Sequence, residues 1–591
     1  MKIPPFQLSS TSSRTRQVLF ALALAASIPA APRAHAQSPT TPTTMGLGAG
    51  EQVKACQVGY LPQEPKFAFL TKAATGNALI KRVSDGATVL SVPIGGVTYD
   101  ADSGDLVRPI EFSALRESGT YRVEVPGVGA SYPFSIGADV FARPFRLAMR
   151  SFYGQRCGIA VNMAPDFPGY SYPACHLDAA FHPSSGKTGP ATAVGGWHDA
   201  GDYGRYIVNS GITTGTLLWA FELNEAKLKG INLDIPESGN AMPDMLDEIR
   251  WNIDWMLQMQ DTDGGVWHKQ TSAGFAGFVM PEQDKAPSLI IGNGVAPFKT
   301  TASTADFAAV CAIAGRVYRA YDAIYADKCL AAAKRAWTWL QTHPDNNYQQ
   351  QPQGIVTGGY GDGNPSDERL WAAAELFHTT GEAEYNDYFL KNYTRWSPTL
   401  SATDAQGWGD LHNLAMYTYA LSKHPLTDAV TVERIKKDAV AAADGIVRRT
   451  QANAYRNPMG TRDYIWGSTS VATNYAMMLG ITYRFVPNPD YLNAAQDALH
   501  YVHGRNTFNT SFVTQVGTKW AMNPHHRPSG ADTNAQPWPG MIMGGPNGNR
   551  RSLPARQWFD IQDDYTTNEL AINWNAPLVF VLAGALPDVK S

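Results

Sequence analysis

The 591-residue chain has few cysteines, no dense block of one charge and no long apolar run after Ile28. Five cysteines, an odd and sparse set, exclude a scaffold held together by many disulfides. The 48 basic and 52 acidic residues are mixed along the chain, without the basic cluster that binding to a phosphate backbone requires. Nucleic acid is therefore not an expected partner, and no membrane span is expected after the N-terminus.

Several catalytic signatures are also missing. No Gly-x-Ser-x-Gly elbow accompanies the pair His525-His526, so these histidines do not indicate a nucleophilic triad. No phosphate-binding glycine loop or dinucleotide fingerprint lies between a strand and a helix. The sequence therefore predicts no organic cofactor.

The N-terminus has the order of a secretory signal. Basic residues precede a short apolar run, and Ala34-His-Ala36 supplies an A-x-A cleavage site. The run is too short to span a bilayer as a stable helix. We expect residues 1–36 to be a signal peptide and residues 37–50, rich in Ser, Thr, Pro and Gly, to be a flexible leader. The mature protein is expected to be secreted or periplasmic, without membrane contact.

The periodicity of apolar residues divides the mature chain into two regions. In the first, Tyr121, Val123 and Val125 alternate with polar residues, as in a β-strand with one buried face. We expect residues 51–137 to form an antiparallel β-sandwich of immunoglobulin size.

In the second region, residues 138–588, apolar residues recur every three or four positions, which predicts helices. The loops between them are rich in Gly, Trp, Tyr, Asn and Asp, which indicates a helical toroid or barrel with a groove on its loop face. The expected helices cover roughly 245–257, 305–325, 328–342, 367–379, 411–422, 434–450, 470–484 and 490–503.

Two groups of carboxylates attract attention. Asp199 and Asp202 lie in a turn of small residues bracketed by aromatics, where backbone N–H groups and water can keep a carboxylate ionised. Glu569 is followed by apolar residues, a setting that raises the pKa of a carboxylic acid. Such a pair suits acid–base cleavage of a glycosidic bond. Each group also has an ordinary interpretation, because Asp-Gly pairs are common in turns and acids often begin helices.

Three segments together resemble the signature regions of glycoside hydrolase family 9. They are Asp199-Ala-Gly-Asp202-Tyr, the run from Ser511 to Arg527 and the segment from Trp558 to Ala576. The resemblance covers essentially the whole mature chain and is to the subgroup with an N-terminal immunoglobulin-like module. It implies an (α/α)6 barrel after the sandwich, and hydrolysis of β-1,4-glucan with inversion at the anomeric carbon.

The resemblance implies roles for individual residues. Asp202 matches the general base, Asp199 a residue that helps to hold the attacking water, and Glu569 the general acid. The two carboxyls of an inverting pair are expected roughly 6.5–9.5 Å apart, which leaves room for water. Three further residues match positions where the family contacts or orients the sugar: His525, Asp560 and Arg527.

Aromatic residues, 11% of the chain, have flat faces that serve either core packing or stacking on sugar rings. We expect part of the sugar binding to come from loop residues beside the signature segments. The candidates are Tyr206, Trp267, His268 and Tyr565.

Cys157, Cys175, His176 and His198 are a spaced set of ligand types that zinc commonly takes. The spacing is not that of a zinc finger, and the residues alone are equally consistent with a Cys157–Cys175 disulfide in an oxidising compartment. The family resemblance implies a structural zinc held by all four. Because His198 adjoins Asp199, this metal would anchor the loop that carries the base.

A second group, Asp362, Asp367 and Glu368, supplies hard oxygen ligands just before a predicted helix. Acids at this position also favour the helix dipole without any metal. The resemblance suggests a calcium site here, with Asp410 as a further ligand.

The expected activity is that of an endo-acting hydrolase on a β-glucan polysaccharide or oligosaccharide, with the protein acting as a monomer. One alternative is an exo-acting member of the family that releases cellobiose or trims short or glucosamine-containing oligosaccharides. Another is a carbohydrate-binding protein that keeps the fold without turnover. The joint presence of Asp199, Asp202 and Glu569 argues against this last alternative.

Overall fold

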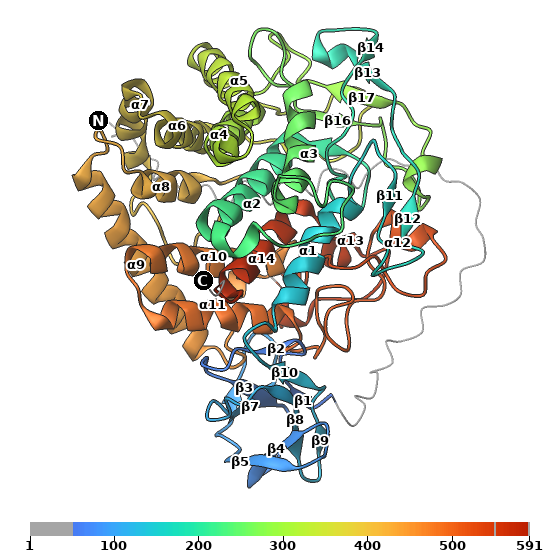
Figure 1. Cartoon of the computed structure of the whole chain (residues 1–591), viewed down its shortest axis with the longest axis vertical. Coiled ribbons are helices and arrows are strands. Elements are labelled where there is room, and N and C mark those ends of the chain that lie inside the picture. Colours follow the sequence, from blue (N-terminus) through green and yellow to red (C-terminus); the bar gives the residue numbers. More distant parts are fainter. Residues whose placement is uncertain (1–50, 549–550, 589–591) are drawn as a thin grey trace, which may run out of the picture. The chain divides into compact units, whose positions relative to one another are not determined.

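The computed structural model describes residues 51–548 and 551–588. The predicted signal peptide (1–36) and leader (37–50) lie outside the described residues. A region of short strands is followed by a helical region, as the sequence predicted (Figure 1). In the part of the chain that the structure describes, no helix is long and apolar enough to cross a membrane.

The N-terminal region folds as two packed sheets. One has the strand order β1-β3-β7-β6 and the other β2-β10-β8-β4-β5, with β9 paired to β8. The predicted alternation is confirmed in β8, where Tyr121, Val123 and Val125 are buried while Thr120 and Arg122 are exposed. The strands are β1 (Val53–Lys54), β2 (Gly59–Tyr60), β3 (Phe67–Leu70), β4 (Asn77–Arg82), β5 (Thr88–Pro93), β6 (Thr98–Tyr99), β7 (Leu106–Glu111), β8 (Gly119–Val125), β9 (Gly129–Ala130) and β10 (Phe134–Ile136).

The helical region contains two kinds of helix. The helices α2, α4, α6, α8, α10 and α14 are buried on nearly all sides, whereas α3, α5, α9 and α11 bury one face. The helices are α1 (Ala142–Gly154), α2 (Ile207–Leu228), α3 (Asp244–Gln258), α4 (Thr301–Val317), α5 (Ala323–Thr342), α6 (Ser366–Thr380), α7 (Ala383–Asn392), α8 (His412–Leu421), α9 (Ala429–Ala452), α10 (Ser468–Phe485), α11 (Pro489–Val502), α12 (Arg527–Ala531), α13 (Tyr565–Asn568) and α14 (Ile572–Ala585).

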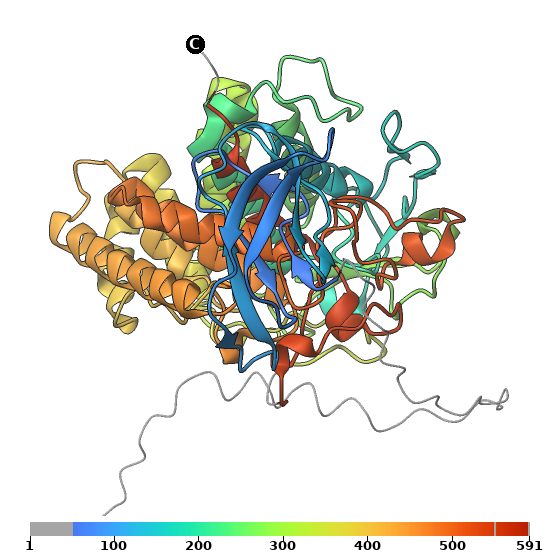
Figure 2. The same ribbon diagram turned by 90° about the horizontal axis from the view of Figure 1, so that it is seen from below.

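The buried helices contact one another in succession. Helix α2 packs against α14 and α4, α4 against α6, α6 against α8, and α10 against α14. The rings of Tyr417 in α8 and Phe485 in α10 stack with centroids 6.2 Å apart. Figure 2 shows α9, α10 and α11 (orange) side by side, in agreement with their mutual contacts. These contacts give the helical region one continuous apolar core.

The predicted helix over 305–325 is wrong as a single element. Helix α4 ends at Val317, and α5 starts after Asp322, whose side chain accepts a hydrogen bond from the Tyr325 N–H. This N-cap satisfies a donor that the first turn leaves unpaired, so a new helix begins there. Helix α2 was not predicted, because its first ten residues, 207–216, are β-branched residues, Asn, Ser and Gly, all of low helix propensity.

A small sheet inside the helical region was also not predicted. Its strand order is β14-β13-β17-β16-β15. The antiparallel pair β15–β16 places Tyr206 directly opposite Lys269. This sheet therefore joins the loop of Asp199 and Asp202 to a segment more than 60 residues later. Its strands are β13 (Ala179–Phe181), β14 (Pro190–Ala191), β15 (Arg205–Tyr206), β16 (Lys269–Thr271) and β17 (Ser288–Ile291).

Gln57 of the sandwich is bonded to a loop of the helical region. Its amide nitrogen donates to the Asn509 carbonyl at 2.9 Å. Its side-chain oxygen accepts from the backbone N–H groups of Thr518 (2.9 Å) and Lys519 (2.8 Å). One side chain thus satisfies three backbone groups of a different domain, and it is itself only 5% exposed.

We expect Gln57→Ala to lower the thermal midpoint, because it leaves backbone polar groups without partners, at a cost of about 1 kcal/mol or more. Asn77→Ala is the matched control, since the Asn77 amide bonds only to the exposed Ser91 hydroxyl. Differential scanning calorimetry of both variants checks this. Equal midpoints for the two variants would show that this contact does not brace the protein.

Candidate active site

Asp202 lies in the loop that leads into β15, and its side chain is 7% exposed. Its Oδ2 accepts hydrogen bonds from the Gly204 N–H and the Tyr206 hydroxyl, both at 3.0 Å. The Tyr206 hydroxyl in turn accepts from the Gly358 N–H at 3.1 Å. Tyr206, predicted as a sugar contact, is buried in this structure and acts on Asp202.

Asp199 lies three residues earlier and is fully buried. Its Oδ1 accepts from the Asn209 side-chain amide and its Oδ2 from the Tyr360 hydroxyl, both at 2.6 Å. Burial, reinforced by the negative charge of Asp202, raises the pKa of Asp199 to about 8, although these two hydrogen bonds oppose the rise. The buried setting of Asp199 therefore disfavours its ionised form.

Glu569 follows α13 and lies beside the same loop. The backbone of Ala571 bridges to Ala200, and the Ile572 N–H donates to the Asp199 carbonyl at 2.8 Å. Burial, with the negative charges of Asp202 and Asp199, raises the pKa of Glu569 well above its usual range. The side chain keeps some exposure. The structure thus brings together three carboxyls that are up to 370 residues apart, and the pKa values of two of them, Asp199 and Glu569, are raised.

His525 is joined to the segment of Glu569 through its backbone. Its N–H donates to the Asn568 carbonyl at 2.8 Å, and its ring Nδ1 lies 2.8 Å from the Gln562 carbonyl. The ring also lies between Phe278 and Tyr565, with centroids 5.3 and 5.8 Å away. This arrangement fixes one ring nitrogen and the orientation of the imidazole, and burial lowers its pKa.

Arg527 and Asp560, the other predicted sugar-contacting positions, bond to loop backbone. The Arg527 guanidinium donates to the carbonyls of Gly201 (2.6 Å) and Ala276 (2.8 Å). Asp560 accepts from the N–H groups of Met522 and Asn523, each at 2.8 Å. Both side chains hold the loops around the carboxyls in place.

The other aromatic candidates differ in exposure. Trp267 and His268 are 3% and 1% exposed and leave no ring face at the surface, so a stacking role is not carried into the proposed function. Trp267 and His268 directly precede the buried strand β16, which explains their burial. Tyr565 is 48% exposed and lies 5.4 Å, centroid to centroid, from Trp466, which is also exposed. Trp466 was missed because it lies outside the signature segments.

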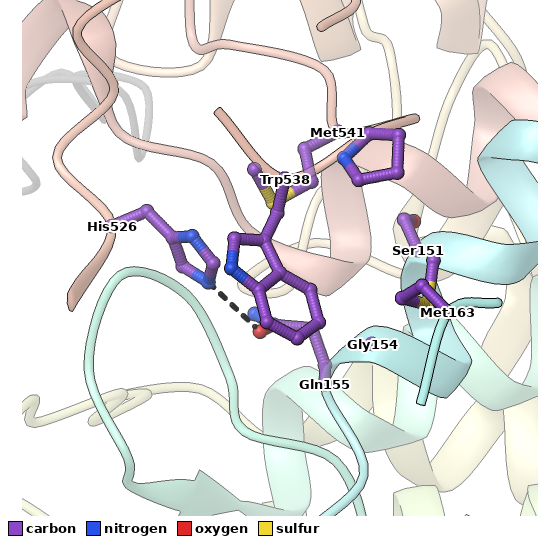
Figure 3. Close-up of a pocket in the computed structure, with 8 residues that line it drawn as sticks. Ser151, Gly154, Gln155, Met163, His526, Trp538 and Met541 are labelled. Atoms are coloured by element: carbon purple, nitrogen blue, oxygen red, sulfur yellow. Dashed lines mark hydrogen bonds between the residues drawn. The ribbon is translucent and has the colours of Figure 1, made fainter. Parts of the chain in front are cut away.

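A polar side chain behind the loop also positions it (Figure 3). His526 Nε2 lies 3.2 Å from the Gln155 side-chain oxygen, and the Gln155 amide nitrogen donates to the Ala200 carbonyl at 2.9 Å. The Gln155 backbone carbonyl accepts from the His198 N–H at 2.7 Å. The surrounding side chains, including Trp538, leave no room for a water molecule. The side chains around this space therefore hold the loop, and the space itself is too small for sugar.

The four predicted zinc ligands come together. One ligand atom each from Cys157, Cys175, His176 and His198 lies within 4.8 Å of the others, and the cysteines are free thiols. His176 Nε2 is 3.3 Å from an Asp284 carboxylate oxygen, while its buried Nδ1 has no hydrogen-bond partner. A carboxylate behind a histidine whose other nitrogen is free is typical of metal sites, so the donor set fits zinc.

The second predicted group is also clustered, with Asp362, Asp367 and Glu368 within the same 4.8 Å limit. Both carboxylate oxygens of the buried Glu368 lack a hydrogen-bond partner, which fits a cation site. Asp410 is outside this set, and its Oδ1 contacts His412 Nδ1. Asp306 of α4 was missed. Both of its buried oxygens are unpaired, and burial, with the charges of Asp367 and Asp362, raises the pKa of its carboxyl well above the usual range.

A carboxyl with a raised pKa beside two loop carboxyls, on a helical domain, defines a site for acid–base hydrolysis. Residues 141–582 match the family described as Glycosyl hydrolase family 9, and residues 49–130 match the Cellulase N-terminal ig-like domain. The chain belongs to glycosyl hydrolase family 9.

The chain is similar to characterised proteins over most of its length. It is 39% identical over 537 residues to Endoglucanase D of Acetivibrio thermocellus, which covers 90% of this chain and 83% of that protein. It is 33% identical to a xyloglucan-specific endo-beta-1,4-glucanase of Bacteroides ovatus, covering 92% and 95%. The crystal structure of a Zn-binding triple mutant of the family 9 endoglucanase J30 superposes with a TM-score of 0.83 at 33% identity, covering 90% and 100%.

The raised pKa of Glu569 predicts an effect on stability. Its carboxyl binds a proton more tightly in the folded than in the unfolded protein, so it destabilises the fold increasingly as pH rises above about 4.5, the unfolded value. Glu569→Gln is expected to raise the thermal midpoint at pH 7 and to have no such effect at pH 4. Glu433→Gln, at an exposed carboxyl of α9, is the control. A pH-independent difference from wild type would contradict the shift.

Proposed function

We propose that the chain hydrolyses internal β-1,4-glucosidic bonds of glucans with inversion, using Asp202 as general base and Glu569 as general acid. The observation that carries this proposal is the raised pKa of Glu569 beside the loop of Asp202. Membership of glycosyl hydrolase family 9, and the endoglucanase names of its relatives, support the choice of substrate.

The hydrogen bonds of the two acids suit these roles. Asp202 uses only Oδ2 for its bonds to Gly204 and Tyr206, and among the described residues nothing donates to its Oδ1. This oxygen is left to take a proton from the attacking water. Glu569 gives its proton to the glycosidic oxygen as the bond breaks, so the sugar leaves as an alcohol. Asp199, held by Tyr360 and Asn209, orients the water beside Asp202.

The proposed architecture is an immunoglobulin-like sandwich over 51–137 and an (α/α)6 barrel over 138–588. The succession of contacts from α2 through α4, α6 and α8, and from α10 through α14 back to α2, supports a ring of six inner helices. The signal peptide predicted over 1–36 makes the protein an exported enzyme, and we propose that it acts as a monomer. Exposed Tyr565 and Trp466 are candidate stacking surfaces for sugar rings.

Glu569→Gln and Asp202→Asn are each expected to lower kcat on carboxymethyl cellulose by about 10²–10⁴-fold, because each removes one proton-transfer group. Reducing-sugar release measures the rate, and viscosity measured in parallel distinguishes internal from terminal cleavage. Glu433→Gln is the control and should keep full activity.

Retention of most activity by Glu569→Gln would rule out its role as the acid. Reducing sugar released without loss of viscosity would indicate the exo-acting alternative. Xyloglucan in a parallel assay tests whether side chains on the glucan are accepted.

We further propose a structural zinc held by Cys157, Cys175, His176 and His198, and a calcium ion at Asp362, Asp367 and Glu368. Zinc would supply a fixed crosslink and take no part in bond cleavage. The support is the clustering of ligand atoms and the orphaned nitrogen of His176. Because His198 precedes Asp199, the crosslink would restrict the loop that carries both loop carboxyls.

Elemental analysis of the purified protein should find one zinc per chain, and His198→Ala should lose it. The variant should also melt at a lower temperature and show a reduced kcat. His182→Ala is a matched control, because the His182 ring bonds only to neighbouring Ser184. Metal-free wild-type protein, or a His198→Ala variant with unchanged midpoint and rate, would contradict the zinc site. Calcium measured in the same samples tests the second site.

A further inference from the structure

Lys269, the first residue of β16, is a fully buried lysine close to the catalytic loop. Its ammonium donates to the Gly358 carbonyl at 2.7 Å, to the Gln351 side-chain oxygen at 2.9 Å and to the Thr357 hydroxyl at 3.1 Å. All three donors are therefore used by neutral acceptors. Among the described residues, no carboxylate forms an ion pair with it. A buried cation without a counter-ion is costly, so its retention calls for a function.

Neighbouring residues hold the same loop. His268 Nε2 lies 2.7 Å from the Gly359 carbonyl, and the hydroxyls of Thr271 and Thr357 are 2.8 Å apart. The segment from His268 to Thr271, which contains β16, thus contacts three consecutive residues of the loop, 357–359. We call these contacts between residues 268–271 and residues 357–359 the clamp. They explain why His268, predicted as a sugar contact, is buried.

The loop at 357–360 positions the hydroxyl donors of both Asp202 and Asp199. The Gly358 N–H donates to the Tyr206 hydroxyl, which donates to Asp202, and the Tyr360 hydroxyl donates to Asp199. The Gly358 backbone packs closely against Tyr206, because a Cβ at position 358 would come within 3.1 Å of the Tyr206 ring. A shift of this loop would therefore displace both hydroxyl donors together.

We propose that Lys269 is a positioning residue for the general base: its ammonium fixes the loop at 357–360 that orients Tyr206 and Tyr360. This rests on the proposed function. Lys269 touches neither substrate nor reacting atoms in this arrangement and acts through Tyr206 and the loop.

The electrostatic surroundings agree with this role. Burial lowers the pKa of Lys269 to about 7, and the negative charge of Asp202 is what opposes that decrease. The other titratable groups facing the ammonium are the rings of Tyr206 and Tyr348, with centroids 5.7 and 5.6 Å away, and His268. Asp202 is thus the negatively charged group that interacts with the Lys269 ammonium.

The test is the kinetics of Lys269→Met, which keeps the length of the side chain and removes its charge and donors. We expect kcat to fall about 10- to 100-fold with KM nearly unchanged, because the base is misplaced while the sugar-binding surface is intact.

The matched control is Lys299→Met. Lys299 is also buried, but its ammonium is paired with Asp261 and Asp263 and, among the described residues, bonds to none of residues 357–360. Its loss should lower stability and leave kcat close to the wild-type value. The double variant Lys269→Met/Tyr206→Phe should be no slower than the worse single variant, because both act on Asp202 through one chain of bonds.

A Lys269→Met variant with wild-type kcat, a change confined to KM, or losses that multiply in the double variant would each overturn the inference. If Lys269→Met does not fold, Thr357→Val replaces it, because it removes one acceptor and leaves the charge. It should lower kcat without affecting KM, and an unchanged kcat would again overturn the inference. An inactive wild type would refute the proposed function itself, whereas an active wild type beside an equally active variant refutes only the role of Lys269.

Discussion

Two carboxyls three residues apart in a buried loop repel each other and lose hydration, and the rest of the site is organised around this constraint. The donors that compensate come from separate parts of the fold. Tyr206 belongs to β15, Asn209 to the first turn of α2, and Tyr360 to a loop before α6. The loop of Asp199 and Asp202 can therefore keep its conformation only when strand, helix and loop are assembled around it.

Environment, more than residue type, separates the roles of the three acids. Asp202 keeps one oxygen free of donors from the described protein and shares the other with Gly204 and Tyr206. Glu569 has burial and two nearby negative charges, which hold its proton. The loop of Asp199 and Asp202 adjoins His198 of the cysteine–histidine cluster, and it is bonded through Tyr206 and Tyr360 to the segment at 357–360, so both attachments limit its movement.

The local sequence was sufficient to predict the three carboxyls of the site and the sandwich, but not helix α2. Asp199, Asp202 and Glu569 were found because each lies in a short segment of unusual composition that resembles a family signature. The sandwich was found because β8 alternates strictly. Helix α2 was missed because its first half consists of residues with low helix propensity.

The supporting residues could not be found from sequence, because their relation to the site exists only in three dimensions. Lys269 meets Tyr206 through the register of β15 and β16, and Tyr360 reaches Asp199 across 161 positions. Gln155 and Asp284 likewise act on residues distant in the sequence. The burial of Trp267 and His268 could not be predicted for the same reason, since aromatic residues near a signature look alike whether they face a groove or lead into a buried strand.

The central claim is that Asp202 activates water on one side of a glycosidic bond while Glu569 protonates the other. Proton NMR of the first-formed products of cello-oligosaccharide hydrolysis tests it most directly, since water attacking opposite the leaving group inverts the anomeric carbon. The account predicts that the α-anomer appears first and then equilibrates. Initial formation of the β-anomer would indicate a covalent intermediate and contradict these roles.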